Sequence, residues 1–303
     1  MEKLFDVVII GAGTAGMTAA IYARRASKTV LLIEAKSYGG QIINTPHIDN
    51  YPANPGISGY DFATAIFEQV KASGAEIVFD KAVNIIDGKI KKVLTENGEY
   101  EGKAVIIATG SENRKLGVEG EDMLVGRGVS YCATCDGAFF RGKKVAVVGG
   151  GNTALEDALY LSDIAETVYL IHRRDGFRGD EATVENLKNR KNVVFVLNSR
   201  VTKLTAEKRL KSIEVTDNDG NVTEIEVNGL FVAVGRIPEN QNFSSVIELD
   251  PAGYAVSGED CKTKTPGIFV AGDNRAKELR QLVTAAADGA AAATEAVKYL
   301  NTI

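Results

Sequence analysis

Two glycine-rich turns, each lying between an apolar strand-like run and a helix-like stretch, constrain the fold of this chain more than any other feature. Gly11-Ala12-Gly13-Thr14-Ala15-Gly16 follows the apolar run at residues 5–10, and Gly149-Gly150-Gly151-Asn152-Thr153-Ala154 follows the run at residues 144–148. Turns of this kind let backbone N–H groups at a helix N-terminus approach a pyrophosphate. The sequence therefore predicts two dinucleotide-binding βαβ units.

Each glycine turn is expected to start a helix that leads into a second strand. The first unit is predicted to have a helix at residues 14–25 and a strand at 29–34, and the second a helix at 153–162 and a strand at 167–172. Further short strands are expected at residues 83–86, 89–95, 104–108, 193–197, 212–216 and 230–234. Each half of the chain is thus predicted to form one nucleotide-binding lobe.

The end of the chain is expected to complete the first lobe. The sequence predicts one more strand at residues 267–271 and an alanine-rich helix at 282–300, which are too small to form a core by themselves. We therefore expect an α/β fold with two Rossmann-like three-layer nucleotide-binding domains, one inserted in the other. The discontinuous domain would span residues 1–112 and 243–303, and the inserted domain residues 113–242.

Composition and charge exclude several classes of function. Apolar residues make up 45% and charged residues 25% of the 303 residues, as is typical of globular proteins. The formal net charge of -5 argues against nucleic-acid binding. No apolar run approaches the about 20 residues of a membrane span, and the first residues show no signal-peptide pattern. We therefore expect a cytoplasmic protein with no membrane partner.

The two predicted units differ at the end of their second strand. The first ends in Glu34, whose carboxylate can accept hydrogen bonds from a ribose diol and would repel a 2′-phosphate, so this site selects FAD or NAD. The second ends in His172-Arg173-Arg174, with Arg178 close behind, a cluster suited to a 2′-phosphate. This site is expected to prefer NADPH to NADH, although a solvated basic run that only follows a strand is the alternative.

A Cys132-Ala133-Thr134-Cys135 tetrad lies just before the second glycine turn. Two thiols at this spacing can form a redox-active disulfide, and the neighbouring Asp136 can supply a proton if burial raises its pKa. A zinc site is the main alternative, but no second pair of cysteines exists and the only histidines are His47 and His172. No metal is therefore expected. Cys261 has no partner in the sequence, and neither it nor His47 is given a role.

Two further features leave alternatives open. Asp273 follows Gly272 at the end of a predicted strand, where a carboxylate can bind a ribityl hydroxyl or equally well cap a helix N-terminus. Phe139 and Phe140 lie next to the thiols, where they can form a docking surface for a protein partner or pack in the core.

The chain as a whole resembles the low-molecular-weight thioredoxin reductases. Besides the two turns, the motifs that carry the resemblance are Gly39-Gly40-Gln41, Ile48-Asp49-Asn50-Tyr51-Pro52, Ala108-Thr109-Gly110, Ser130-Tyr131-Cys132-Ala133-Thr134-Cys135-Asp136-Gly137, His172-Arg173-Arg174-Asp175-Gly176-Phe177-Arg178, Gly272-Asp273 and Arg280-Gln281. They occur in family order from residue 9 to about residue 290. Ala53, Asn274 and Ala287 depart from the residues common in the family, without removing a phosphate contact or a thiol.

The resemblance implies FAD in the first lobe, NADPH in the second and a homodimer. It further implies that electrons pass from NADPH to FAD, then to a Cys132–Cys135 disulfide, and from the dithiol to thioredoxin or a thioredoxin-like protein. The residues expected at FAD are Gly11, Gly13, Thr14, Ala15, Gly16, Glu34, Ala35, Gly39, Gly40, Gln41, Asn50, Ala108, Thr109, Gly110, Gly272, Asp273, Arg280, Gln281 and Leu282. Those expected at NADPH are Gly149, Gly151, Asn152, Thr153, Ala154, His172, Arg173, Arg174, Arg178, Gly235 and Arg236.

Two other functions stay open at this point. A related flavoprotein disulfide reductase would use another donor, such as ferredoxin, or another redoxin as acceptor; the arginine cluster argues against the ferredoxin-fed version. A redox sensor would use the thiol pair as a switch without turnover.

Overall fold

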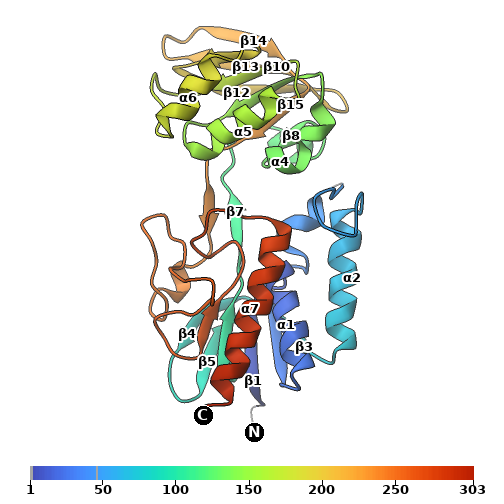
Figure 1. Ribbon diagram of the computed structural model, residues 1–303, viewed down its shortest axis with the longest axis vertical. Coiled ribbons are helices and arrows are strands. Elements are labelled where there is room, and N and C mark those ends of the chain that lie inside the picture. Colours follow the sequence, from blue (N-terminus) through green and yellow to red (C-terminus); the bar gives the residue numbers. More distant parts are fainter. Residues whose placement is uncertain (1–2, 46) are drawn as a thin grey trace. The chain divides into compact units, whose positions relative to one another are not determined.

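The computed structural model describes residues 3–45 and 47–303, which divide into two compact units (Figure 1). The first unit comprises Met1–Glu112 and Ile237–Ile303, and the second comprises Asn113–Arg236. The predicted α/β fold with one unit inserted in the other is confirmed, but the chain returns to the first unit at Ile237 and not at residue 243. The two crossings, β7 (Ser111–Asn113) and β16 (Arg236–Pro238), pair with each other.

The first unit is built on a seven-stranded sheet of order β3-β2-β1-β6-β5-β4, with β17 paired to β6. Its strands are β1 (Leu4–Ile10), β2 (Val30–Glu34), β3 (Glu76–Phe79), β4 (Ala82–Ile86), β5 (Lys91–Thr95), β6 (Glu99–Ile107) and β17 (Ile268–Val270). Its helices are α1 (Thr14–Arg25), α2 (Gly59–Ala72) and α7 (Leu282–Leu300), with short 3-10 helices η1 (Gly40–Asn44) and η3 (Gln241–Phe243). All pairings are parallel except β4 with β5 and β5 with β6.

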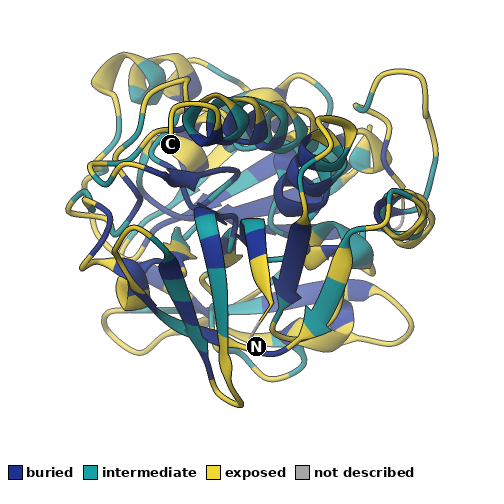
Figure 2. Cartoon of the chain, turned by 90° about the horizontal axis from the view of Figure 1, so that it is seen from below, coloured by how far each residue is buried: buried dark blue, intermediate teal, exposed yellow. Residues whose placement is uncertain are grey.

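Both faces of this sheet are covered, as a mainly parallel sheet requires. On one face Val7 and Ile9 pack against buried residues of α1 and α7, and on the other Val8 and Ile10 lie in one buried cluster with Phe243 and Val246. Strands β1 and β2 are buried along most of their length, whereas the loops around the sheet are exposed (Figure 2). The sheet thus fixes the carboxyl end of β1, where the first glycine turn lies.

The second unit contains a five-stranded parallel sheet of order β11-β10-β9-β15-β8 and a separate antiparallel sheet β12-β13-β14. Its strands are β8 (Val129–Ser130), β9 (Lys144–Val148), β10 (Thr167–Ile171), β11 (Val193–Val196), β12 (Ser199–Ala206), β13 (Leu210–Asp217), β14 (Val222–Glu226) and β15 (Gly229–Val232). Its helices are α3 (Glu121–Leu124), α4 (Ala133–Asp136), α5 (Asn152–Ser162) and α6 (Glu181–Lys188). The 3-10 helix η2 (Gly137–Phe140) follows α4 directly.

Strand β9 separates two hydrophobic clusters in this unit. Val145 and Val147 pack with Leu155 of α5, whereas Ala146 and Val148 pack with Ile213 of the antiparallel sheet. Alternate residues of one buried strand therefore join a helical layer and an antiparallel layer on its two sides. The three-layer arrangement predicted from the sequence is present, with a β-sheet as the third layer.

Candidate active site

Close backbone packing explains two glycines of the first turn. Gly11 adopts a φ of 104°, and a Cβ placed on it would lie 2.4 Å from the carbonyl oxygen of Ala108. A Cβ on Gly16 would lie 1.8 Å from the carbonyl oxygen of Gly11. No other residue fits either position without moving backbone. These contacts hold the end of β1, the start of α1 and the Ala108–Gly110 segment together.

Gly13, in contrast, is not required by packing of the protein against itself. A Cβ built on Gly13 would meet nothing within 4 Å. The residue is the N-cap of α1, and no side chain caps the helix there. An open glycine at an uncapped helix N-terminus leaves N–H groups accessible to a phosphate, so this turn fits a pyrophosphate.

Glu34 is tied to the turn by its own carboxylate. Its Oε2 accepts a hydrogen bond from the N–H of Ala12 at 2.7 Å, and its Oε1 accepts one from the N–H of Lys36 at 2.8 Å. A carboxylate can accept about four hydrogen bonds, so these two leave capacity for a ribose diol. The acid is held at the rim of the turn with Ala35 exposed beside it.

Segments distant in the sequence meet near this turn. Gly39 donates its N–H to the carbonyl of Ala12 at 2.8 Å, and Gly39 and Gly40 both have positive φ. Asn50 donates from its side-chain amide to Oε1 of Gln281 at 3.0 Å. Gly39 is thus bonded to the first turn, and Asn50 to Gln281, within one unit. Gln41 has an exposed side chain.

The start of α7 decides whether Asp273 caps a helix. The N-cap of α7 is Gln281, which exchanges hydrogen bonds with Thr284 in a capping box, so Asp273 does not cap this helix. Leu282 is the first helical residue, and the Arg280 guanidinium stacks on Tyr254 with 4.0 Å between Cζ and the ring centroid. Helix capping is therefore wrong for Asp273, and a ribityl contact stays a prediction.

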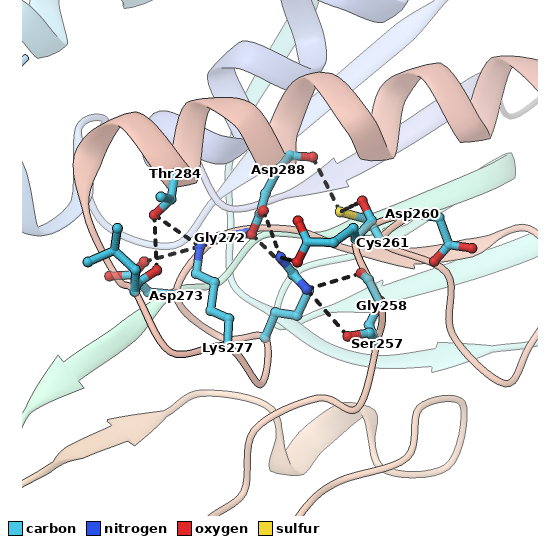
Figure 3. Close-up of polar contacts among 12 residues, drawn as sticks. Ser257, Gly258, Asp260, Cys261, Gly272, Asp273, Lys277, Thr284 and Asp288 are labelled. Atoms are coloured by element: carbon cyan, nitrogen blue, oxygen red, sulfur yellow. Dashed lines mark hydrogen bonds and ion pairs between the residues drawn. The ribbon is translucent and has the colours of Figure 1, made fainter. Parts of the chain in front are cut away.

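A buried ionic network joins the Gly272-Asp273 turn to Asp288 in α7 (Figure 3). The Asp288 carboxylate accepts from the N–H of Gly272 at 3.0 Å, from Nζ of Lys277 at 2.9 Å and from Nη2 of Arg275 at 3.0 Å. Lys277 also lies 3.8 Å from Oδ1 of Asp273. The hydrogen bonds and charges of the two bases outweigh burial and lower the pKa of Asp288. The network anchors the Gly272-Asp273 turn.

Sequence reasoning missed Arg275, Lys277 and Asp288. Their only sequence signal was two bases soon after Gly-Asp and one acid in an alanine-rich helix. Cys261 lies at the edge of the same network, where its thiol donates to the carbonyl of Asp288 at 3.6 Å. Burial, with the Asp288 charge adding to it, raises the Cys261 pKa to about 12, so this thiol stays protonated.

Buried polar atoms also fit a bound cofactor in the first unit. Thr109 Oγ1 and Arg280 Nε are buried and have no hydrogen-bond partner among residues 3–45 and 47–303. Buried polar groups of this kind normally have a partner. Both belong to segments predicted to bind FAD, and a ligand with several acceptors would satisfy them.

The second glycine turn repeats the geometry of the first. A Cβ on Gly149 would lie 2.4 Å from the carbonyl oxygen of Ala233, and one on Gly151 would meet nothing within 4 Å. Gly151 is the uncapped N-cap of α5, as Gly13 is of α1. Gly150 has a role that its sequence context does not indicate, because a Cβ there would lie 2.0 Å from Cε1 of His172. The glycine makes room for that ring.

His172 is placed differently from the arginines that follow it. Its ring is buried against the turn and stacks on Phe177 with 5.2 Å between ring centroids. Burial lowers the His172 pKa, and the charges of the three nearby arginines lower it further. The imidazole is therefore neutral at physiological pH and does not add to the positive charge of the rim.

Three exposed arginines form that positive rim. Arg173, Arg174 and Arg178 have no ion pair with a carboxylate in the described part of the chain. The N–H of Arg178 donates to the carbonyl of Gly150 at 2.8 Å, which brings it to the turn. Unpaired guanidinium groups beside an open helix N-terminus fit a phosphate ligand.

The helix after this turn carries an unexpected acid. Burial raises the pKa of Asp157 to about 7; the neighbouring Glu156 charge adds to the rise, and Arg236 opposes it. Gly235, which precedes Arg236, has a φ of 112°. Asn152 and Thr153 are exposed at the start of the helix, where the Asn152 side chain accepts from the N–H of Asp180 at 2.8 Å.

Cys132 and Cys135 form a disulfide at the start of α4, with 5.3 Å between their Cα atoms. Cys132 is the N-cap of this short helix, and its sulfur accepts from the N–H of Cys135 at 3.2 Å. The hydroxyl of Thr134 lies 3.4 Å from the same sulfur. Two hydrogen-bond donors therefore point at Cys132, an arrangement that favours a thiolate there after reduction.

Asp136 has the raised pKa that a proton donor needs. Burial raises it, and a hydrogen bond from Ser130 opposes the rise. The backbone N–H of Asp136 donates to the carbonyl of Cys132 at 3.1 Å. The carboxyl is therefore part of the same turn as the disulfide.

The two phenylalanines after the thiols have different environments. Phe140 packs edge-on against Phe231, with 5.3 Å between ring centroids, and belongs to the core. Phe139 is 42% exposed. Docking is thus the wrong reading for Phe140, and it stays a prediction for Phe139.

Within the described residues, no three His, Cys, Asp or Glu side chains gather in a way that would hold a metal ion. No helix there has the length and apolar character needed to cross a membrane.

Comparison with known proteins agrees with this geometry. A model of the pyridine nucleotide-disulphide oxidoreductase family matches residues 5–289. The chain is 43% identical to a thioredoxin reductase of Listeria innocua over 99% of this chain and 95% of that protein. It is 40% identical to a bifunctional thioredoxin reductase/thioredoxin of Mycobacterium leprae over 99% of this chain and 66% of that protein. The crystal structure of thioredoxin reductase from Streptococcus pyogenes matches with a TM-score of 0.95 and 39% identity over 100% of both chains.

Proposed function

Because the chain belongs to the pyridine nucleotide-disulphide oxidoreductase family and is an oxidoreductase, we propose that it is a thioredoxin reductase that uses FAD and NADPH. We call the two glycine turns, at residues 11–16 and 149–154, the first and second cradle. The observation that carries the proposal is that one chain contains both cradles, with oppositely charged rims, and a Cys132–Cys135 disulfide. FAD, when bound, supplies a carrier that takes a hydride from a nicotinamide and passes two electrons to a disulfide.

The first cradle is assigned to FAD. Its open Gly13 and the N-terminus of α1 would hold the pyrophosphate, and Glu34 would accept hydrogen bonds from the ribose diol. The residues joined to it across the first unit would enclose the rest of the cofactor. They are Gly39, Gly40, Gln41, Asn50, Thr109, Asp273, Arg280 and Gln281.

The second cradle is assigned to NADPH. Gly151 and the N-terminus of α5 would hold the pyrophosphate, and the exposed Arg173 and Arg174 would bind the 2′-phosphate. His172 would shape the turn from beneath and make no ionic contact with the phosphate.

The disulfide supplies the exit for electrons. Its reduction breaks one S–S bond and consumes two electrons and two protons to give two thiols. The N–H of Cys135 would stabilise a Cys132 thiolate, which favours Cys132 as the sulfur that attacks a disulfide of thioredoxin or a thioredoxin-like protein. Asp136, with its raised pKa, would give one proton to the dithiol turn.

An anaerobic NADPH titration of the holoenzyme tests the whole proposal. We expect bleaching of the flavin band, followed by repeated turnover when oxidised thioredoxin is added. Stoichiometric reduction without turnover would instead identify a redox sensor. A parallel titration with reduced ferredoxin tests the other donor. If ferredoxin bleaches the flavin band and NADPH does not, ferredoxin would replace NADPH as the proposed donor.

Exchange of Cys135 for Ser separates the two halves of the reaction. Reduction of the flavin by NADPH should continue in Cys135→Ser, because the nucleotide cradles are unchanged, while thioredoxin turnover is lost. Cys261→Ser is the matched control and should keep turnover, because that thiol is buried and protonated. Turnover retained by Cys135→Ser would show that the disulfide is not the exit.

The homodimer and the cytoplasmic location stay predictions. The dimer depends on the resemblance alone, and light scattering of the purified holoenzyme tests it directly. A mass equal to twice the 32.3 kDa chain is the expected result.

A further inference from the structure

Ser130 places its hydroxyl between the disulfide turn and the Asp136 carboxyl. It is the last residue of β8 and is only 4% exposed. Its Oγ donates to Oδ2 of Asp136 at 2.6 Å and accepts from the N–H of Cys132 at 3.1 Å. One hydroxyl therefore joins the backbone of the first cysteine to the side chain of the residue after the second.

This hydroxyl can satisfy both protonation states of Asp136. When the carboxyl is ionised, the Ser130 O–H donates to Oδ2, which lies 2.6 Å from Oγ. When Oδ2 is protonated, its O–H donates a hydrogen bond to Ser130 Oγ, and the Ser130 O–H turns to another acceptor. The carbonyl of Cys132, 3.3 Å from Oγ, is an acceptor already in reach. Neither state leaves a buried polar atom of this group without a partner, which would be costly.

Other charged groups have little influence on this carboxyl. The elements packed against α4 are η2 and α5. Helix η2 has no titratable side chain, and α5 carries Glu156, Asp157 and Tyr160. None of these contributes to the raised pKa of Asp136, whose causes are burial and, in the opposite direction, the Ser130 hydrogen bond. Ser130 is thus the one side chain that moderates the effect of burial.

We propose that Ser130 is a positioning residue that keeps Asp136 able to give up a proton and take one back while the Cys132–Cys135 disulfide is reduced. This inference rests on the proposed function, in which the reduced flavin supplies the two electrons that break the S–S bond. Asp136 gives one of the two protons to a sulfur and regains it from solvent, and the second proton comes with the two electrons from the reduced flavin. Ser130 holds the carboxyl in place throughout and contacts Cys132 only through its backbone N–H and carbonyl.

The test is the titration of Asp136 in the Ser130→Ala holoenzyme. Loss of a hydrogen bond to the ionised form should raise the Asp136 pKa by about one pH unit. The infrared band of the protonated carboxyl, identified by its absence in Asp136→Asn, gives that pKa in the resting oxidised protein without any electron transfer. In single-turnover reoxidation of the flavin by the disulfide, the alkaline limb should move upward by the same amount.

Two variants control for packing. Ser130→Thr keeps a hydroxyl and should titrate within about 0.3 pH unit of the wild type. Ser162→Ala removes an equally buried hydroxyl of the same unit, one that donates only to the carbonyl of Leu159, and should leave both measurements unchanged. If Ser130→Ala does not fold as a flavoprotein, Ser130→Gly removes the same hydroxyl.

An unchanged infrared titration in Ser130→Ala or Ser130→Gly would overturn the proposal. An upward shift of the same size in Ser162→Ala would also overturn it, because the effect would then come from any buried hydroxyl. Failure of thioredoxin turnover in the wild type would defeat the proposed function instead, and the infrared titration would still report on Ser130.

Discussion

The two glycine cradles have nearly the same turn and very different rims. Cβ atoms on Gly11 and Gly149 would each lie 2.4 Å from an alanine carbonyl of a neighbouring strand end, and those on Gly13 and Gly151 would meet nothing within 4 Å. The turn is therefore built twice from the same backbone contacts. Selection between nucleotides must come from elsewhere, because the atoms that would face a pyrophosphate are alike in both.

The rims supply that difference. In the first cradle the Glu34 carboxylate turns back to accept from the N–H of Ala12. In the second, Arg173 and Arg174 are exposed and have no carboxylate partner among the described residues. An acid held in place suits a neutral diol, whereas unpaired guanidinium groups suit a phosphate. We therefore expect nucleotide specificity to depend on the strand end and stability to depend on the turn.

The largest effects should come from the glycines, which separate these two properties. Gly11→Ala and Gly149→Ala each force a Cβ into backbone and should lower the free energy of unfolding by about 3 kcal/mol or more. Gly13→Ala and Gly151→Ala should change it by less than about 0.5 kcal/mol, yet weaken binding of FAD and NADPH respectively. Thermal unfolding and cofactor titration measure the two quantities.

Matched destabilisation by Gly13→Ala and Gly11→Ala would break this comparison. The fold would then need Gly13 itself, and the open space around this residue would not be evidence for a bound ligand.

A smaller effect is expected at the arginine rim. Replacement of Arg173 and Arg174 by Ala should lower kcat/KM for NADPH by about 10- to 100-fold and leave that for NADH within about twofold, because only NADPH has the 2′-phosphate. Arg209→Ala, at an exposed position in the same unit, is the control and should change neither. Steady-state kinetics with both nucleotides provide the measurement, and equal losses for the two would remove the assignment.

Features that depend on short stretches of chain could be predicted from the sequence. The turns, the strands before them and the chemistry of the rims each depend on residues a few positions apart, so spacing and composition were sufficient. The return of the last helix to the first unit also followed, because a lone strand and helix cannot form a core.

Features that join distant residues could not be predicted. Nothing near Gly150 in the sequence indicates that His172 lies against it, and the network of Arg275, Lys277 and Asp288 forms only when α7 packs over the Gly272 turn. The structure gives a local reason for the glycine common in the family at position 53 and none for its replacement: Ala53 has a φ of 70°, a left-handed conformation that favours glycine.

The smallest predicted effect concerns the helices behind the two turns. The offset that relates Gly149 to Gly11 relates Asp157 in α5 to the fully buried Ala19 in α1. With a pKa of about 7 in the native state and an ordinary value of 3.8, Asp157 keeps a proton that the unfolded chain loses between about pH 4 and pH 7. Stability therefore falls as pH rises through this window and stays reduced above it.

Asp157→Asn should remove this loss of stability above pH 7. Helix α5, like α1, would then have no buried acid at this position. After allowance for solvent screening of a half-buried group, we expect a gain of about 1–2 kcal/mol at pH 8 and no gain near pH 4. Glu156→Gln, which removes the like charge beside it, should give a smaller gain in the same direction. Thermal unfolding at the two pH values measures both variants. An equal change at pH 4 and pH 8 would mean that Asp157 does not titrate between them, and the two helices would then differ in packing alone.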